Sequence, residues 1–74
     1  MNEFMNALYN AVGCEVSGVY DGVPFLGEIV HTRVKYGNDI SVLVAEGEKT
    51  FLIHGTEFLA GDSGPFKNLH VYFK

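Results

Sequence analysis

The chain has 74 residues, of which 47% are hydrophobic, 14% aromatic and 19% charged, and its formal net charge is −4. This length allows one domain, which buries only about 60% of the surface that the unfolded chain exposes. The negative net charge opposes a general attraction to phosphates, so any nucleic-acid contact must be local. The single cysteine, Cys14, excludes an internal disulfide, and a chain without disulfides suits a reducing, cytoplasmic location.

No apolar run approaches the roughly 18 residues of a membrane span. The first 13 residues contain one acidic and no basic residue, unlike a signal peptide. We therefore expect no membrane association. The apolar content is high for so small a domain, which favours assembly of several copies, although a monomer with some exposed apolar surface is the alternative.

The first predicted element is a short amphipathic helix over residues 2–12. Its apolar side chains recur at spacings of three and four: Phe4, Met5, Leu8, Ala11 and Val12. Asn2 is a candidate N-cap, and Gly13 follows the end of the helix. About three turns of helix are marginal alone in water, so we expect this helix to dock on the remaining domain as a lid.

Five short runs rich in β-branched and aromatic residues follow the helix: 16–20, 25–32, 40–45, 50–53 and 69–73. Turn sequences lie at residues 21–22 and 46–48, and loop sequences at 36–39 and 61–65. The pattern predicts a mostly β fold in a single domain over residues 1–74. Residues 1–13 would form the helix, and residues 14–74 a small five-stranded barrel whose closure hides the strand edges.

Residues 21–29 resemble the first motif of the Sm-like family, in which a glycine turn precedes an aromatic residue, a second glycine and an apolar residue. Gly22, Phe25, Gly27 and Ile29 fit these steps. Gly22 permits the positive φ of a turn, and Gly27 lets a strongly bent strand fold over the barrel. The alternative interpretation is that these residues form an ordinary β-hairpin without any relation to the family. The segment 52–55 resembles the second motif, an apolar residue followed by Arg-Gly, with His54 in place of arginine.

The resemblance implies a short N-terminal helix followed by a strongly bent, five-stranded Sm-like barrel. In that family the fifth strand would lie at residues 57–60, whereas the stronger strand pattern here is at 69–73. Either residues 55–67 form an inserted loop, which we favour, or an additional strand ends the chain.

Residues 31–38 form the local basic feature of the chain. Arg33 and Lys35 could contact phosphates, Tyr36 could stack on a base, and Asn38 could bond a base edge. A solvent-facing strand end is the ordinary alternative. The resemblance implies a homo-oligomeric ring with these residues at its RNA site and His54 and Gly55 at the pore. Relative to the family, Arg33 replaces an Asp, and Asn38 is shifted by one residue.

Motifs for catalysis or metal binding are missing from the sequence. The three histidines are far apart, Cys14 has no cationic neighbour in sequence, and Glu46 and Glu48 bracket a turn glycine. We therefore expect no enzyme activity, no cofactor and no metal. The leading hypothesis is a ring that binds single-stranded RNA, and the alternative is an oligomeric module that binds a protein partner.

Overall fold

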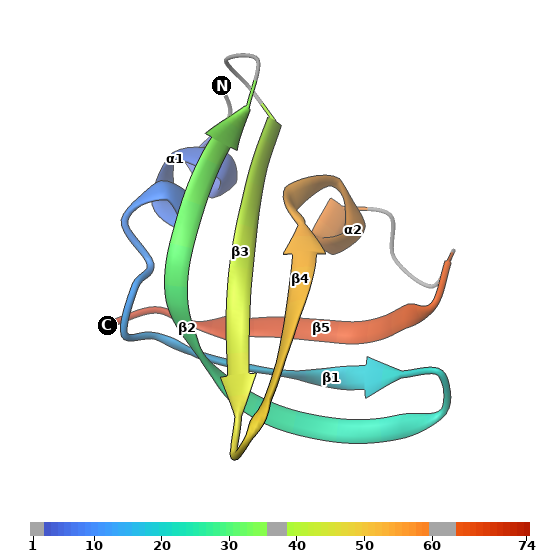
Figure 1. The fold of residues 1–74 in the computed structure, drawn as a ribbon. Helices are drawn as coiled ribbons and strands as arrows, with labels where there is room; N and C mark the ends of the chain where they lie inside the picture. Colours follow the sequence, from blue (N-terminus) through green and yellow to red (C-terminus); the bar gives the residue numbers. More distant parts are fainter. Residues whose placement is uncertain (1–2, 36–38, 60–63) are drawn as a thin grey trace.

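The computed structural model describes residues 3–35, 39–59 and 64–74. These residues form two short helices and five antiparallel strands in one sheet (Figure 1). In chain order the elements are α1 (Glu3–Tyr9), β1 (Glu15–Tyr20), β2 (Val23–Lys35), β3 (Asp39–Glu46), β4 (Lys49–His54), α2 (Gly55–Leu59) and β5 (Phe66–Tyr72). The predicted mostly β fold with an N-terminal helix is confirmed.

The sheet is bent, and its long strand β2 belongs to both halves. Residues 23–28 of β2 pair with β1, and residues 28–35 pair with β3. As a result, β3 and β4 run across the direction of β1 and β5 (Figure 1). The strand order is β4-β3-β2-β1-β5, so consecutive strands from β1 to β4 form a meander.

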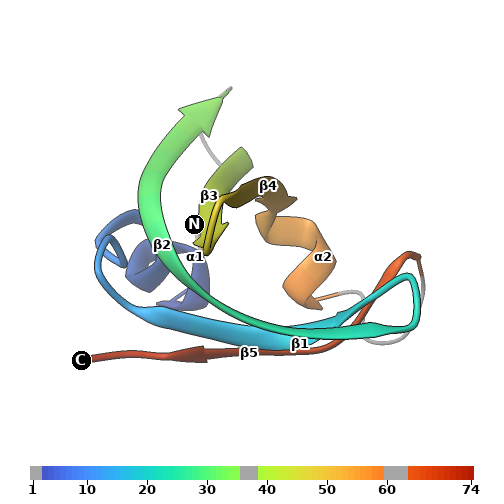
Figure 2. The ribbon, with the colours of Figure 1, turned by 60° about the horizontal axis from the view of Figure 1, so that its bottom comes forward.

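The predicted barrel closure is wrong for the part of the chain that the structure describes. Strands β4 and β5 are the two edges of the sheet and do not pair with each other. The chain leaves β4 directly into α2, and α2 contacts β3, β4 and β5. Figure 2 shows α2 between β4 and the layer formed by β1 and β5. A helix therefore fills the space across which the edge strands would have to meet.

Two glycines of the 21–29 segment have the backbone roles that the sequence predicts. Asp21 and Gly22 have φ values of 49° and 81°, as both central residues of a tight type I′ hairpin turn require. At Gly27, an added Cβ would lie 2.6 Å from Val44 Cγ1 and 2.7 Å from the Ala45 carbonyl oxygen. Only a residue without a side chain lets β2 bend this closely over β3.

Helix α1 is shorter than predicted. It ends at Tyr9, and turn hydrogen bonds from Asn10 N to Ala7 O and from Ala11 N to Leu8 O, both 3.1 Å, lead the chain out of it. Val12 was expected on the buried stripe of the helix, but it is 56% exposed, because the helix ends before it. The proposed N-cap, Asn2, lies outside the described residues.

The apolar side of α1 docks on the sheet, as expected. Met5 and Leu8 are buried, and the helix contacts β2 and β3. Thr32 of β2 donates a hydrogen bond from Oγ1 to the Tyr9 carbonyl, 3.1 Å away. This bond satisfies a carbonyl at the end of the helix that has no partner within the helix.

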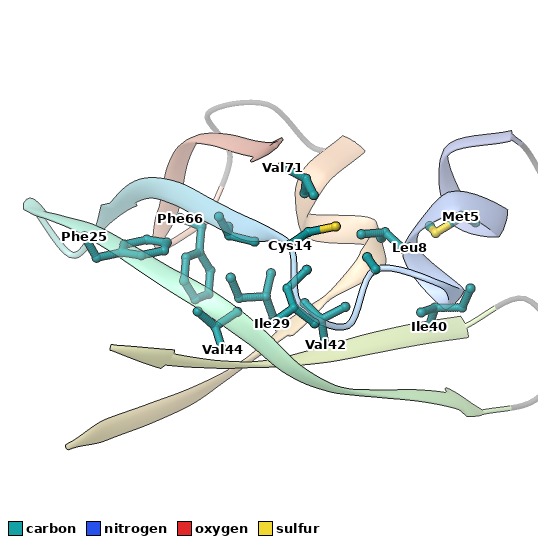
Figure 3. Packing of buried hydrophobic residues seen from close by; sticks show 13 residues of the cluster. Met5, Leu8, Cys14, Phe25, Ile29, Ile40, Val42, Val44, Phe66 and Val71 are labelled. Atoms are coloured by element: carbon teal, nitrogen blue, oxygen red, sulfur yellow. The ribbon is translucent and has the colours of Figure 1, made fainter. Parts of the chain in front are cut away.

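One hydrophobic core lies between the two halves of the bent sheet and α1 (Figure 3). Its side chains come from α1, the segment that follows it and all five strands: Met5, Leu8, Ala11, Cys14, Val16, Phe25, Ile29, Ile40, Val42, Val44, Ile53, Phe66 and Val71. The fully buried side chains of β3 are Ile40, Val42 and Val44, which alternate along the strand and lie on its covered face. Cys14 is a free, buried cysteine, consistent with packing.

The last strand lies where the residue pattern predicts it. Strand β5 includes most of the 69–73 segment and begins earlier, at Phe66. The alternative strand at 57–60 is wrong for residues 57–59, which belong to α2; Ala60 lies outside the described residues. The expected inserted loop is therefore partly helical. Glu57 favours this short helix because its side chain accepts a hydrogen bond from His54 N, 2.9 Å away.

Candidate functional site

A bulge in β2 decides which side chains face away from the core. Ile29 pairs with Val44, but His31 pairs with Leu43, so Val30 is an extra residue in β2. Simple alternation would place residues 29, 31 and 33 on one face. The bulge reverses the alternation, and His31 and Arg33 are exposed while Ile29 stays fully buried.

Beyond the bulge, two cross-strand rows occupy the outer face of β2, β3 and β4. One row consists of Arg33, Ser41 and His54, which are register partners on the three strands. The next row consists of His31, Leu43 and Leu52. These six residues line a shallow pocket of about 280 Å³, which we call the outer-face pocket. It combines one permanent cation, two imidazoles, a hydroxyl and two aliphatic side chains.

Ser41 fixes the ring of His54 within this pocket. Ser41 Oγ lies 3.1 Å from His54 Nδ1, and the serine is only 6% exposed. With Nδ1 occupied, Nε2 has no partner among the described residues and is the ring nitrogen available to a ligand. The backbone of His54 is held as well, because its N–H donates to the Glu57 carboxylate. The imidazole is therefore prepositioned before any ligand arrives.

Five of the six predicted site residues fall into three groups. Arg33 and His54 are exposed and meet in the outer-face pocket. Lys35 is the last residue of β2, and its backbone pairs with Asp39 at the same end of the sheet. Tyr36 and Asn38 lie outside the described residues.

Gly55 is placed differently from the other predicted site residues. It is buried as the first residue of α2, and an added Cβ would lie 2.7 Å from Met5 Sδ and 2.9 Å from the Ile40 carbonyl oxygen. The structure thus gives Gly55 a close packing contact between α2, α1 and β3, away from the outer face.

Sequence reasoning did not select Ser41, Leu43 or Leu52 for the site. Each is an ordinary strand residue, and only the register of β3 against β2 and β4 brings them beside Arg33 and His54. The available signal was the alternation of β3, because a buried Ile40 and Val42 leave Ser41 and Leu43 on the opposite face.

Within residues 3–35, 39–59 and 64–74, no group of three or more His, Cys, Asp or Glu side chains is arranged to hold a metal ion. In the same ranges, neither helix has the length and apolar composition needed to cross a membrane. Comparison with protein-family models, with curated proteins and with solved structures found no match.

Proposed function

We propose that this chain is an Sm-like protein that binds single-stranded RNA through the outer-face pocket and works as a homo-oligomeric ring. The observation that carries the proposal is the row formed by Arg33, Ser41 and His54 on three neighbouring strands. This row places the permanent positive charge of Arg33 beside hydrogen-bonding side chains on a chain whose net charge is −4, as a local phosphate site requires.

The side chains of the outer-face pocket suit different parts of a nucleotide. The Arg33 guanidinium can bond a phosphate with two parallel N–H groups. His54, held by Ser41, offers Nε2 to a phosphate or a base edge. Leu52, 49% exposed, gives an apolar surface for a sugar or base. Lys35, Tyr36 and Asn38 follow Arg33 in the chain, and in the proposal they extend the site.

The two open edges of the sheet support assembly. Strands β4 and β5 each pair on one side only among the described residues, and pairing β4 of one copy with β5 of the next would satisfy both edges. In a ring, a weak site in each subunit acts on the same strand of RNA, and effective concentration raises the overall affinity.

A second candidate function is an oligomeric module that binds a protein partner without RNA. It is favoured by exposed apolar side chains on the sheet, among them Val23, Leu26 and Leu52 at 64%, 53% and 49% exposure. Exposed apolar surface of this kind is commonly covered by another protein.

Fluorescence anisotropy with U-rich and A-rich oligonucleotides separates the two functions. In the RNA function, binding weakens as salt rises. In Arg33→Ala, the plot of the logarithm of the association constant against the logarithm of salt concentration becomes less steep, by about 0.7 for each phosphate that the guanidinium neutralises. The matched control is Lys67→Ala, which removes one exposed charge from β5, far from the pocket in strand order.

Flat titrations at high micromolar protein would reject the RNA function, as would equal reductions of affinity in Arg33→Ala and Lys67→Ala. Ser41→Ala should weaken binding by freeing the His54 ring, and this effect should disappear when His54 is also replaced by alanine. Native mass measurement tests assembly separately, and a persistent monomer contradicts the ring.

A further inference from the structure

A second and larger pocket, of about 500 Å³, lies at the other end of β3 and β4. It opens between the β1–β2 turn and the β3–β4 turn, both visible in Figure 1. The rings of Tyr20, Phe25 and Phe51 line it, and the charged side chains at it are Asp21, Glu46 and Lys49. We call it the aromatic pocket. Its volume falls in the range of small-molecule sites, about 300 to 1,000 Å³.

The aromatic walls are held in place by the core. Phe25 is 8% exposed and meets Phe51 edge to face, with ring centroids 4.8 Å apart and an 84° interplanar angle. Tyr20 and Phe51 are nearly parallel, 15° apart in plane with centroids separated by 6.5 Å. Behind them the buried ring of Phe66 lies 4.7 Å from Tyr20. Tyr20 itself is 49% exposed, so the pocket is both ordered and accessible.

The charges around the aromatic pocket favour a cation. Two residues with carboxylates, Asp21 and Glu46, and one with an ammonium group, Lys49, line the pocket. The Glu46 carboxylate is oriented by a 2.9 Å hydrogen bond that its Oε2 accepts from Leu26 N. Asp21 is fixed at the turn, where its backbone N donates to the Pro65 carbonyl at 3.1 Å. The negative faces of the aromatic rings add to this preference for positive charge.

The apolar walls narrow the class of cation. A fully alkylated, quaternary ammonium group has no N–H to satisfy and covers its charge with methyl groups, so it matches aromatic faces without needing many acceptors. A guanidinium ion carries five N–H donors, and it would need more acceptors than two carboxylates, one of them already bonded, offer in this pocket. Phosphate groups are disfavoured by the same carboxylates.

We propose that the aromatic pocket is a binding site for a quaternary ammonium group, held between Tyr20, Phe25 and Phe51 and neutralised by Asp21 and Glu46. This site is distinct from the outer-face pocket, because it lies on the inner face of the sheet and at the opposite end of β3 and β4. The inference does not rest on RNA binding, and each site can fail without the other.

Choline and its carbon analogue, in which a tert-butyl group replaces trimethylammonium, test the proposal with ligands of matched shape. Titration is followed by the NMR signals of the Tyr20 and Phe51 rings. We expect choline to bind about 2- to 30-fold more tightly than the carbon analogue, the range that cation–π contacts supply. Equal affinity of the two ligands would overturn the proposal, since an apolar cavity alone would then explain binding.

Variants locate the site and keep the test valid if one of them fails to fold. Phe51→Leu and Tyr20→Leu should remove the preference for choline over its analogue. Asp21→Asn should weaken the binding of choline and leave the binding of its carbon analogue unchanged. Asparagine tolerates the φ of 49° at this position. Tyr72→Leu is the matched control, because Tyr72 on β5 is 50% exposed, close to the exposure of Tyr20, and does not line the pocket. Unchanged choline affinity in Asp21→Asn and Phe51→Leu would contradict the assignment.

The source of the ammonium group is distinguished by separate titrations. Three ligands present a cationic group on different molecules: free choline, the N-acetyl amide of trimethyl-lysine and the N-acetyl amide of arginine. Tighter binding of the trimethyl-lysine derivative assigns the site to a modified protein side chain, and tighter binding of choline to a small metabolite or headgroup. Preference for the arginine derivative over both would overturn the quaternary-ammonium assignment.

Discussion

Replacement of Gly27 by alanine tests the bend on which the fold depends. The new methyl group would lie 2.6 Å from Val44 Cγ1 and 2.7 Å from the Ala45 carbonyl oxygen, whereas ordinary contact begins at 3.4 Å. The methyl carbon and the carbonyl oxygen would have to separate by about 0.7 Å. The Ala45 backbone cannot move that far freely, because Glu28, the neighbour of Gly27, is paired with Ala45 in the β2–β3 ladder.

Overpacking of this kind costs about 1 to 3 kcal/mol of unfolding free energy. For a domain of this size, each kcal/mol shifts Tm by about 4 to 8 °C, so we expect Tm to fall by about 5 to 20 °C. Urea unfolding and thermal melts followed by circular dichroism measure the change. The control is Glu28→Ala, which truncates the exposed neighbouring side chain and should change stability by no more than about 0.5 kcal/mol.

A Gly27→Ala variant as stable as the wild type would refute this reasoning. It would mean that β2 does not approach β3 as closely at Gly27 as the structure shows. The same result would remove the main physical support for comparing residues 21–29 with the first Sm motif.

Two further predictions concern α1 and β5. Leu8→Ala should lower the unfolding free energy by about 2 to 5 kcal/mol, because Leu8 is fully buried beneath the sheet. The control is Asn6→Ala, a change on the exposed side of α1. Equal unfolding free energies of the two variants in urea titrations would contradict docking of the helix. Asn68 has a φ of 56°, a value that glycine adopts easily and valine does not. Asn68→Val should therefore lower the unfolding free energy by about 1 to 2 kcal/mol, and Asn68→Gly should leave it unchanged or raise it. Equal Tm values for these two variants would count against this backbone geometry.

Much of the fold was predictable because its signals are local. The Asp21-Gly22 turn depends on two adjacent residues that tolerate positive φ. The strands from β1 to β4 follow from runs of β-branched and aromatic residues, and β5 was found in the same way. Phe25, the aromatic residue of the motif resemblance, is buried in the core.

The candidate site was predictable only in part. Arg33 and His54 were selected from a basic segment and a motif resemblance, and neither signal could indicate that Ser41 lies between them. Their common face depends on the bulge at Val30, where one additional residue reverses the alternation of β2. Bulges arise from pairing with a partner strand, so the sequence of β2 alone does not specify one.

The sequence by itself determined the N-terminal helix, the order of the five strands and the tight turns, because these depend on side-chain chemistry and on spacing within one segment. Only the tertiary structure decided whether the sheet closes, since α2 lies between its edge strands. It also brought the aromatic pocket together from two hairpins that are distant in the chain. Contacts between distant segments depend on register and on the bending of the whole sheet, which no single segment encodes.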